Sequence, residues 1–203
     1  MSKRSSFTRQ YWVALRAMVV FTLVLGVGYT AVITGVGQLA LPAQANGSMV
    51  QDADGKVVGS SLIGQSFTDA DGAALPQWFQ SRPSAAGDGY DASASSGSNY
   101  GPENEELIAA IAERKAAVAK LEGVSENEVP ADAVTASASG LDPQISPAYA
   151  RLQVARVAEA RDLPKADVEA LVESHIKGRD LAILGDETVD VLELNLALAA
   201  LGR

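Results

Sequence analysis

Cysteine is absent from this 203-residue chain, and histidine occurs only once, at His175. Without cysteine there is neither a disulfide framework nor a thiolate metal site, and a single histidine cannot form a zinc site alone. His175 lies next to an apolar helical stripe. We therefore interpret it as a partly buried structural residue, and we expect no bound metal.

Motifs that carry enzyme chemistry are missing as well. The sequence has no GxxxxGK(S/T) phosphate loop, no HExxH, no GxSxG and no Asp-Lys-Thr-Gly phosphorylation string. Its acidic pairs do not stand out from a solvated surface. The sequence therefore predicts no catalytic residues and no intrinsic cofactor, which favours an accessory subunit over an enzyme.

Acidic residues are absent from the start of the chain up to Asp52. Residues 1–16 carry basic side chains instead, namely Lys3, Arg4, Arg9 and Arg16. Positive charge that flanks a first membrane span is retained in the cytoplasm, so we expect residues 1–16 to form a cytoplasmic tail. Beyond Asn46, 25 acidic residues face 12 basic ones, a formal charge of −13. This excess argues against nucleic acid as a partner.

Charge of either sign is missing between Ala17 and Ala40. A helix rises about 1.5 Å per residue, so roughly 20 apolar residues cross the hydrocarbon core of a bilayer. The sequence predicts a single-pass membrane protein, with a span at 17–40 and an extracytoplasmic domain at 46–203. A cleaved signal peptide is the alternative, because Ala43-Gln44-Ala45 fits a cleavage site, although signal h-regions of about 7–15 residues are shorter than this run.

Small and hydroxylated residues recur along one side of the predicted span. They are Gly26, Thr30, Thr34 and Gly37, spaced by four, four and three. Small residues let helix backbones approach closely in lipid, so this face is a candidate docking surface for partner helices. The alternative is that glycine and threonine are simply common in membrane spans.

The remaining residues, about 158 of them, are enough for one domain of mixed α and β structure, the α+β class. Met49-Val50 and Val57-Val58 flank Asp54-Gly55, which predicts a hairpin with a tight turn. The string DADG recurs at residues 69–72. We interpret both copies as turns, because neither has the further ligands of a calcium loop.

Helices are predicted from Pro102 to Gly123, from Pro147 to about Arg161, from Pro164 to Gly178 and from Val191 to Leu201. Ser146 and Asp190 stand where N-caps would stand. Residues 84–101 are rich in serine, glycine and alanine, a composition typical of a flexible loop, although Tyr90 and Asn99 indicate partial order.

Several strings resemble one family when they are taken together and in order. They are Gly59–Gln65, Phe79–Ser84 (FQSRPS), Ser96–Asn99, Val134–Pro147 (VTASASGLDPQISP), Arg156–Arg161 and Val189–Leu198. Following an N-terminal span, they resemble the C chain of Kdp-type potassium-transporting ATPases over nearly the whole sequence.

The resemblance implies a subunit of an ATP-driven complex of the inner cell membrane that imports potassium with high affinity. The implied partners are a channel-like potassium-binding subunit and a P-type ATPase subunit. The family is described as a catalytic chaperone that raises the ATP affinity of the ATPase subunit, and as binding ATP itself. That last property conflicts with the predicted topology, because ATP is scarce outside the cytoplasm. We therefore treat contact with ATP as implied by the resemblance only.

Polar residues inside the family-like strings are the candidates for a subunit interface. They are Gln80, Ser81, Arg82, Ser98, Asn99, Ser137, Ser139, Asp142 and Asn195. Each could instead serve only as a turn or cap residue. A stand-alone membrane-anchored module that binds an external cation or solute through the hydroxyl-rich stretches is the alternative function.

Overall fold

The computed structural model describes residues 3–201. The chain divides into two compact units, Met1–Ser48 and Met49–Arg203, and each is described by itself. One helix of the first unit is long and apolar enough to cross a membrane, and the second unit combines helices with short sheets. The predicted class, α+β with a single N-terminal candidate span, is confirmed.

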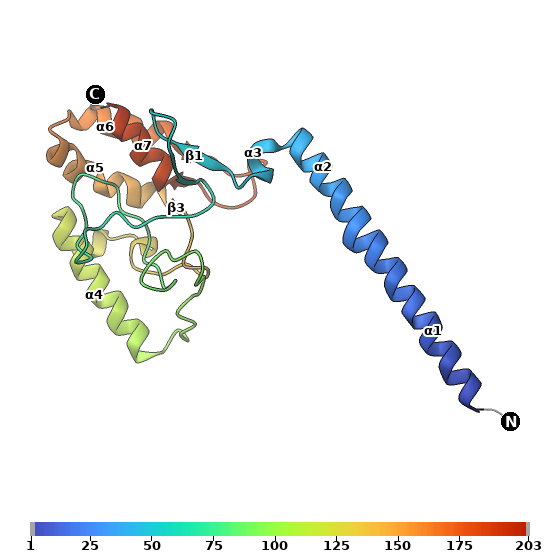
Figure 1. Ribbon diagram of the computed structural model, residues 1–203. Helices are drawn as coiled ribbons and strands as arrows, with labels where there is room; N and C mark the ends of the chain where they lie inside the picture. The colour runs from blue at the N-terminus through green and yellow to red at the C-terminus, as the bar shows by residue number, and fades with distance from the viewer. Residues whose placement is uncertain (1–2, 202–203) are drawn as a thin grey trace. The chain divides into compact units, whose positions relative to one another are not determined.

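The first unit is a helical rod in three consecutive segments (Figure 1). They are α1 (Lys3–Phe21), a π-helical segment η1 (Thr22–Tyr29) and α2 (Thr30–Ala40). The candidate span runs from Phe7 to Ala40, and none of its most apolar window is buried within the structure. A surface this apolar and this exposed is what a lipid-facing helix requires.

The π-helical segment differs from the uniform α-helix that the sequence predicts. Its wider turns coincide with Gly26 and Gly28, where the backbone has the greatest freedom. Just beyond it, the Thr30 hydroxyl donates to the Leu25 carbonyl five residues back, at 3.5 Å. Of the predicted docking face, Gly26 therefore lies in the π segment, whereas Thr30, Thr34 and Gly37 lie in α2. π-helical turns are rare and often occur at functional positions.

The rod ends at Leu41, whose backbone leaves the helical region at φ −137° because Pro42 follows it. A single turn, α3 (Pro42–Ala45), comes next. The side-chain amides of Gln38 and Asn46 exchange two hydrogen bonds of 3.3 and 3.1 Å across this bend. Gly37 faces Ala45 at van der Waals distance, so the chain itself partly covers this member of the predicted docking face.

The second unit begins with the predicted hairpin. Strands β1 (Met49–Gln51) and β2 (Val57–Ser60) pair antiparallel. In the turn, one carboxylate oxygen of Asp52 accepts the N–H groups of Asp54 and Lys56 at 3.0 and 2.9 Å. Asp69 accepts two backbone N–H groups in the same way. Both DADG strings are thus turns, as predicted, and their leading carboxylates are used by the backbone.

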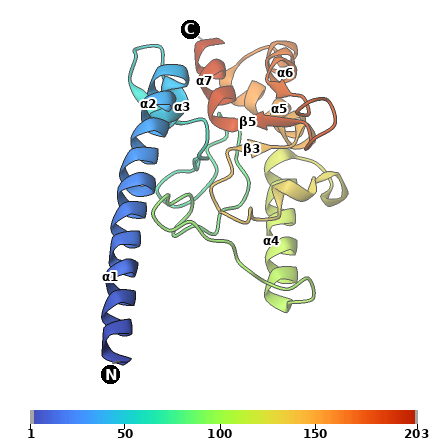
Figure 2. The same ribbon diagram turned by 90° about the vertical axis from the view of Figure 1, so that its right-hand side faces the viewer.

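Two helices of this unit begin at the caps that the sequence predicts, and the helix predicted from Pro102 begins at Glu105 after an unpredicted cap, Asn104. Ser146 caps one helix through the Tyr149 N–H, and Asp190 caps another through the Glu193 N–H. Asn104 caps a third helix, which ends at Gly123 with φ +68°. The helices are α4 (Glu105–Glu122), α5 (Pro147–Arg161), α6 (Lys165–Ser174) and α7 (Val191–Leu201). Figure 2 shows α5, α6 and α7 together at one end of the unit, with α4 extending away from them.

A small antiparallel sheet was not predicted from the sequence. It has the order β3-β5-β4, with β3 (Gln144–Ile145), β5 (Thr188–Asp190) and β4 (Ile176–Lys177). The prediction that the helix from Pro164 continues to Gly178 is therefore wrong. The helix ends at Ser174, because Ile176 and Lys177 pair with Val189 and Thr188 instead. Strands of two or three residues are too short for a periodic sequence signal.

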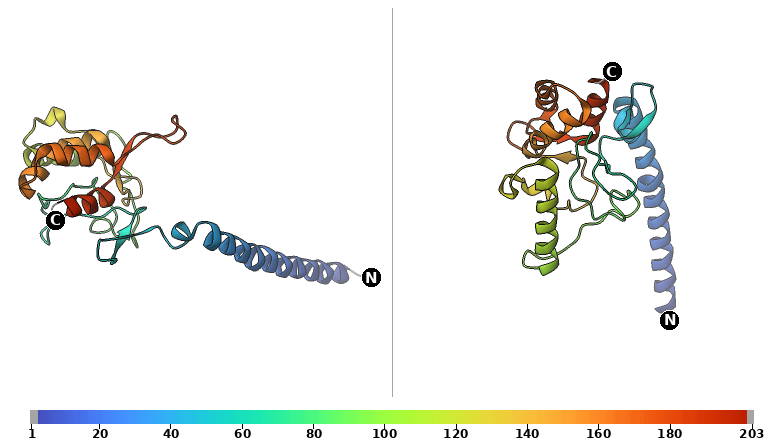
Figure 3. Two further views of the ribbon diagram at one scale, coloured as in Figure 1. Left: turned by 90° about the horizontal axis from the view of Figure 1, so that it is seen from above. Right: turned by 90° about the vertical axis from the view of Figure 1, so that its left-hand side faces the viewer.

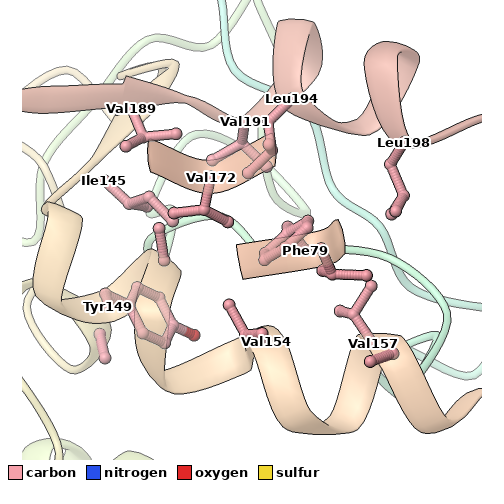
Figure 4. Close-up of a cluster of buried hydrophobic side chains, with 14 of the residues drawn as sticks. Phe79, Ile145, Tyr149, Val154, Val157, Val172, Val189, Val191, Leu194 and Leu198 are labelled. Carbon is pink, nitrogen blue, oxygen red and sulfur yellow. The ribbon is translucent and has the colours of Figure 1, made fainter. Parts of the chain in front are cut away.

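The hydrophobic core lies where α5, α6 and α7 meet this sheet. Its fully buried members include Val157, Val172, Val189 and Leu194. Figure 4 shows Phe79 among side chains from these elements, although Phe79 itself belongs to no helix or strand. Burial of a phenylalanine contributes roughly 1.5–3 kcal/mol, so this segment is part of the core rather than a loop over it.

Residues 76–84, which we call the strap, pass through this core without belonging to a helix or strand, and they begin in a turn where the Trp78 N–H donates to the Leu75 carbonyl at 3.1 Å. Side-chain amides satisfy the peptide groups of the strap. The Asn195 amide pairs with the N–H and C=O of Phe79 at 2.9 and 3.0 Å, and the Gln153 amide pairs with those of Gln80 at 2.6 and 3.1 Å. Side chains of α5 and α7 therefore supply the hydrogen bonds that a neighbouring strand would otherwise supply.

A buried ion pair holds the beginning of the strap. Arg156 of α5 binds both carboxylate oxygens of Glu122 at 3.0 Å and donates to the carbonyls of Pro76 and Trp78. The Glu122 side chain is fully buried. Burial raises the pKa of this carboxyl, and the Arg156 guanidinium opposes the shift. Arg161, 4.1 Å from the Trp78 ring centroid, adds a cation–π contact.

We expect Asn195→Ala to destabilise the protein markedly. The substitution leaves the Phe79 N–H and C=O buried without partners, and each such group costs about 1–3 kcal/mol. Gln51→Ala, at an exposed amide, should change stability by less than about 0.5 kcal/mol. Guanidinium unfolding of the detergent-solubilised chain, followed by tryptophan fluorescence, measures both effects. Equal effects of the two variants would show that Asn195 does not hold the strap.

Candidate anion-binding groove

A groove of about 790 Å³ lies between the strap, helix α4 and the loop that follows the first hairpin. Gln80, Ser81 and Arg82 form one wall, and the apolar side chains of Phe67, Val118 and Leu121 contribute to the others. Its complete lining is Ser66, Phe67, Thr68, Gly72–Ala74, Gln80–Ser84, Gly89, Tyr90, Arg114, Ala117, Val118, Lys120, Leu121, Ala133 and Tyr149.

The charge of this lining is opposite to that of the domain. Arg82, Arg114 and Lys120 line the groove, and no aspartate or glutamate does. Arg82 is paired with Asp142, which lies outside the lining, so Arg114 and Lys120 carry the net positive charge of the groove in a domain with twice as many acidic as basic residues. Walls of low dielectric strengthen such a field, which favours a negatively charged occupant.

Arg82 is held rigidly at the edge of the groove. Its Nη1 donates to the Asp142 carboxylate at 3.1 Å, and its Nη2 donates to the Thr135 carbonyl at 3.3 Å. Its Nε is buried without a hydrogen-bond partner among the described residues. Asp142 in turn accepts from the Ser139 hydroxyl at 3.1 Å. The guanidinium is therefore pre-oriented by loop residues from a distant part of the sequence.

Tyr90 closes the same edge. Its hydroxyl donates to the Arg82 carbonyl at 2.8 Å. Burial raises the pKa of Tyr90 to about 12, so the ring stays a neutral phenol at physiological pH. On the opposite wall, Arg114 donates to the Val134 carbonyl at 3.2 Å, which fixes its position on α4. The groove thus presents oriented donors and cations, but no paired nucleophile and base.

The structure brings together the strings that carried the family resemblance. The Gly64 N–H donates to the Leu141 carbonyl, the Ser84 hydroxyl to the Gly140 carbonyl and the Ser96 N–H to the Ser139 carbonyl, at 2.7–2.9 Å. These bonds tie three separate loops into one layer beside the groove. Residues 84–96, which composition indicates to be a flexible loop, are held in place by them.

The predicted interface residues fall into distinct groups. Gln80, Ser81 and Arg82 line the groove, Ser139 and Asp142 support it, and Ser137 is buried. Asn195 is a core residue that holds the strap, and Ser98 and Asn99 are exposed. Gly26, Thr30, Thr34 and Gly37 belong to the first unit. Contact of any of these residues with a partner stays a prediction.

Sequence reasoning missed Arg114, Lys120, Gln153 and the ion pair of Arg156. A signal existed for Arg114, because it shares a helix face with Ala117, Val118 and Leu121 at the spacing i, i+3, i+4 and i+7. A basic residue on an otherwise apolar stripe indicates a lined cavity.

His175 is partly buried, as predicted, with its Nδ1 2.9 Å from the Leu171 carbonyl.

Comparison with known proteins identifies the family. The family model described as "K+-transporting ATPase, c chain" matches residues 11–200. The chain is a K+-transporting ATPase C chain by family. It is 55% identical to the potassium-transporting ATPase KdpC subunit of Caulobacter vibrioides, over 92% of this chain and 91% of the relative. The KdpC subunits of Mycobacterium tuberculosis and Gemmatimonas aurantiaca are 51% and 56% identical, over 94% and 88% of this chain and 97% and 86% of those relatives.

Membership of the C-chain family makes the chain a subunit of a potassium-importing complex, as the resemblance predicts. The one apolar helix agrees with a membrane protein. The family match covers the strap and the groove in full and the apolar helix from residue 11 onward.

We expect Gly64→Ala to loosen the loop layer beside the groove. A Cβ at Gly64 would lie 2.4 Å from a Tyr90 ring carbon and 2.5 Å from the Asp142 carbonyl oxygen. Overpacking of this kind costs about 1–3 kcal/mol, or about 2–4 °C of melting temperature for each kcal/mol. Gly178→Ala, where a Cβ meets nothing within 4 Å, is the matched control. Equal melting temperatures for both variants would contradict the tight approach at Gly64.

Proposed function

We propose that the chain is a non-catalytic accessory subunit needed for assembly and stability of the potassium-importing ATPase complex. Membership of the C-chain family over residues 11–200 is the observation that carries this proposal. The absence of catalytic motifs from the sequence supports the non-catalytic part. The proposed partners are a channel-like potassium-binding subunit, a P-type ATPase subunit and the lipid bilayer.

The proposed orientation places the N-terminus in the cytoplasm and the second unit outside it. Its support is the charge of residues 1–16, which carry four basic and no acidic residues. In this orientation the groove faces a compartment where ATP is scarce. We therefore propose that the subunit raises the ATP affinity of the ATPase subunit indirectly, through the partner subunits and its own span.

The groove is the proposed contact of the second unit with an acidic segment of a partner subunit. Arg114 and Lys120 favour a carboxylate or phosphate occupant, and the apolar walls favour the side chains that flank such a group. ATP offers the same anionic chemistry, so an experiment has to separate the two occupants. The lining also disfavours the alternative of an external cation-binding module at this site, because no carboxylate faces the groove.

The span is the proposed docking helix within the membrane. We expect the double substitution Gly26→Leu with Thr30→Leu to reduce recovery of the partner subunits, because larger side chains prevent close helix approach in lipid. Val24→Leu, a change of one methylene two residues away, is the control. Affinity purification through a tagged chain and growth at limiting potassium measure the effect. Unchanged recovery of the partners would refute docking through this face.

Arg114→Gln tests the groove. Charge-assisted hydrogen bonds contribute about 1.5–3 kcal/mol, so removal of the guanidinium should weaken its contact roughly tenfold or more. Lys165→Gln makes the same charge change at an exposed residue that does not line the groove. In the purified complex, a partner carboxylate as occupant predicts lower recovery of the partner subunits. Photolabelling of the wild-type chain by an azido-ATP analogue, lost in Arg114→Gln at full recovery, would instead establish ATP as the occupant. Unchanged recovery without such labelling would refute a role for Arg114.

A further inference from the structure

The most exposed apolar side chains of the second unit lie at the tip of one hairpin. Strands β4 and β5 continue into residues 178–187, which we call the arm. At its tip Leu181 is 84% exposed and Ile183 is 75% exposed, and Leu184 is 55% exposed. Figure 3 shows the arm projecting away from the helices of this unit. Among the described residues of the second unit, none covers most of the Leu181 or Ile183 side chain, and Leu184 is half covered.

The arm is an ordered structure rather than a loose loop. Asp180 and Leu184 exchange backbone hydrogen bonds of 2.9 and 2.8 Å, which close a tight turn around the tip. At the base, Arg179 pairs with Asp186 at 3.2 Å. Lys177 pairs with Glu193 of α7 at 2.7 Å, which fixes the hairpin to the helix.

The backbone at the tip is strained in a way that presents the side chains outward. Leu181 and Ala182 have φ values of +51° and +65°, the only consecutive non-glycine residues with positive φ in the part of the chain described here. Leucine and alanine gain nothing from this conformation, and glycine would adopt it without strain. The tight turn that is closed between Asp180 and Leu184 imposes this conformation, at a cost that glycine would avoid.

The charge of the arm decides between lipid and protein as its partner. Residues 178–187 carry three acidic residues and one basic residue, whose guanidinium is already paired. Segments that insert at a membrane surface combine apolar residues with lysine, arginine, tryptophan or tyrosine, and anionic lipid repels negative charge. The arm has an aliphatic tip on an acidic base, so it fits an apolar socket with a basic rim on a protein.

From the aliphatic tip, the acidic base and the strained turn, we propose that the arm docks into an apolar, basic-rimmed socket on another subunit of the same complex. The proposal rests on the proposed function as an accessory subunit, and it assigns a defined contact to that function. A packed socket of this kind would bury Leu181 and Ile183, and removal of their apolar surface from water favours the contact.

A single cysteine tests the arm directly, because the natural chain contains none. Ile183→Cys is introduced into the full-length chain, and its reaction rate with a water-soluble maleimide is measured for the chain alone in detergent and for the purified complex. Lys165→Cys, at an exposed position on α6, is the reference. We expect at least tenfold protection of Cys at position 183 in the complex, and unchanged labelling at position 165.

The outcomes separate this proposal from the proposed function. Failure of the wild-type chain to recover its partners would refute the accessory function itself. Recovery of the complex with equal labelling at position 183, alone and assembled, would refute the arm contact only. Protection of the chain alone in vesicles of anionic phospholipid would identify lipid as the partner and would likewise overturn the proposal.

A second variant tests the same contact without relying on the reactivity of an introduced cysteine. Leu181→Ser with Ile183→Ser removes the apolar tip, and both side chains are exposed, so the melting temperature of the chain alone should not change. We expect recovery of the partner subunits to fall at least tenfold. Full recovery with this double variant would refute docking through the arm.

Discussion

The second unit depends on one constraint, which is that a segment outside any helix or strand crosses its core. The peptide groups of Phe79 and Gln80 are buried, and buried peptide groups need partners. Asn195 of α7 and Gln153 of α5 supply them, and Arg156 holds the carbonyls that precede them. Side chains on two helices thereby take the place of a sheet, and the position of the strap follows from the packing of those helices.

The groove follows from the same constraint. Because the strap is fixed at Gln80, the next residues along the chain place Arg82 against Asp142 and Ser84 against Gly140. The loops that meet there need close approaches, and Gly64 and Gly140 provide them where a Cβ would collide with a backbone oxygen. The arm is built differently, since its hairpin is anchored to α7 through Lys177 and Glu193 and leaves its tip free of the core.

Local signals in the sequence were sufficient for the span, the first hairpin, both DADG turns and the helix caps. Each depends on neighbours within a few residues, as when Ser146 and Pro147 start α5. The three-stranded sheet could not be predicted in this way, because its strands have two or three residues and pair across the sequence. For the same reason the helix that ends at Ser174 was extended too far.

The sequence by itself determined that the chain has one apolar span, an acidic domain of mixed structure and the strings of one family, since composition and local spacing are properties of the chain alone. Only the tertiary structure decided that Asn195 serves the core, that Arg82, Arg114 and Lys120 share one groove, and that Leu181 and Ile183 stay exposed. These facts depend on contacts between residues up to 116 positions apart, and no local pattern encodes which distant group fills a hydrogen bond or covers an apolar side chain.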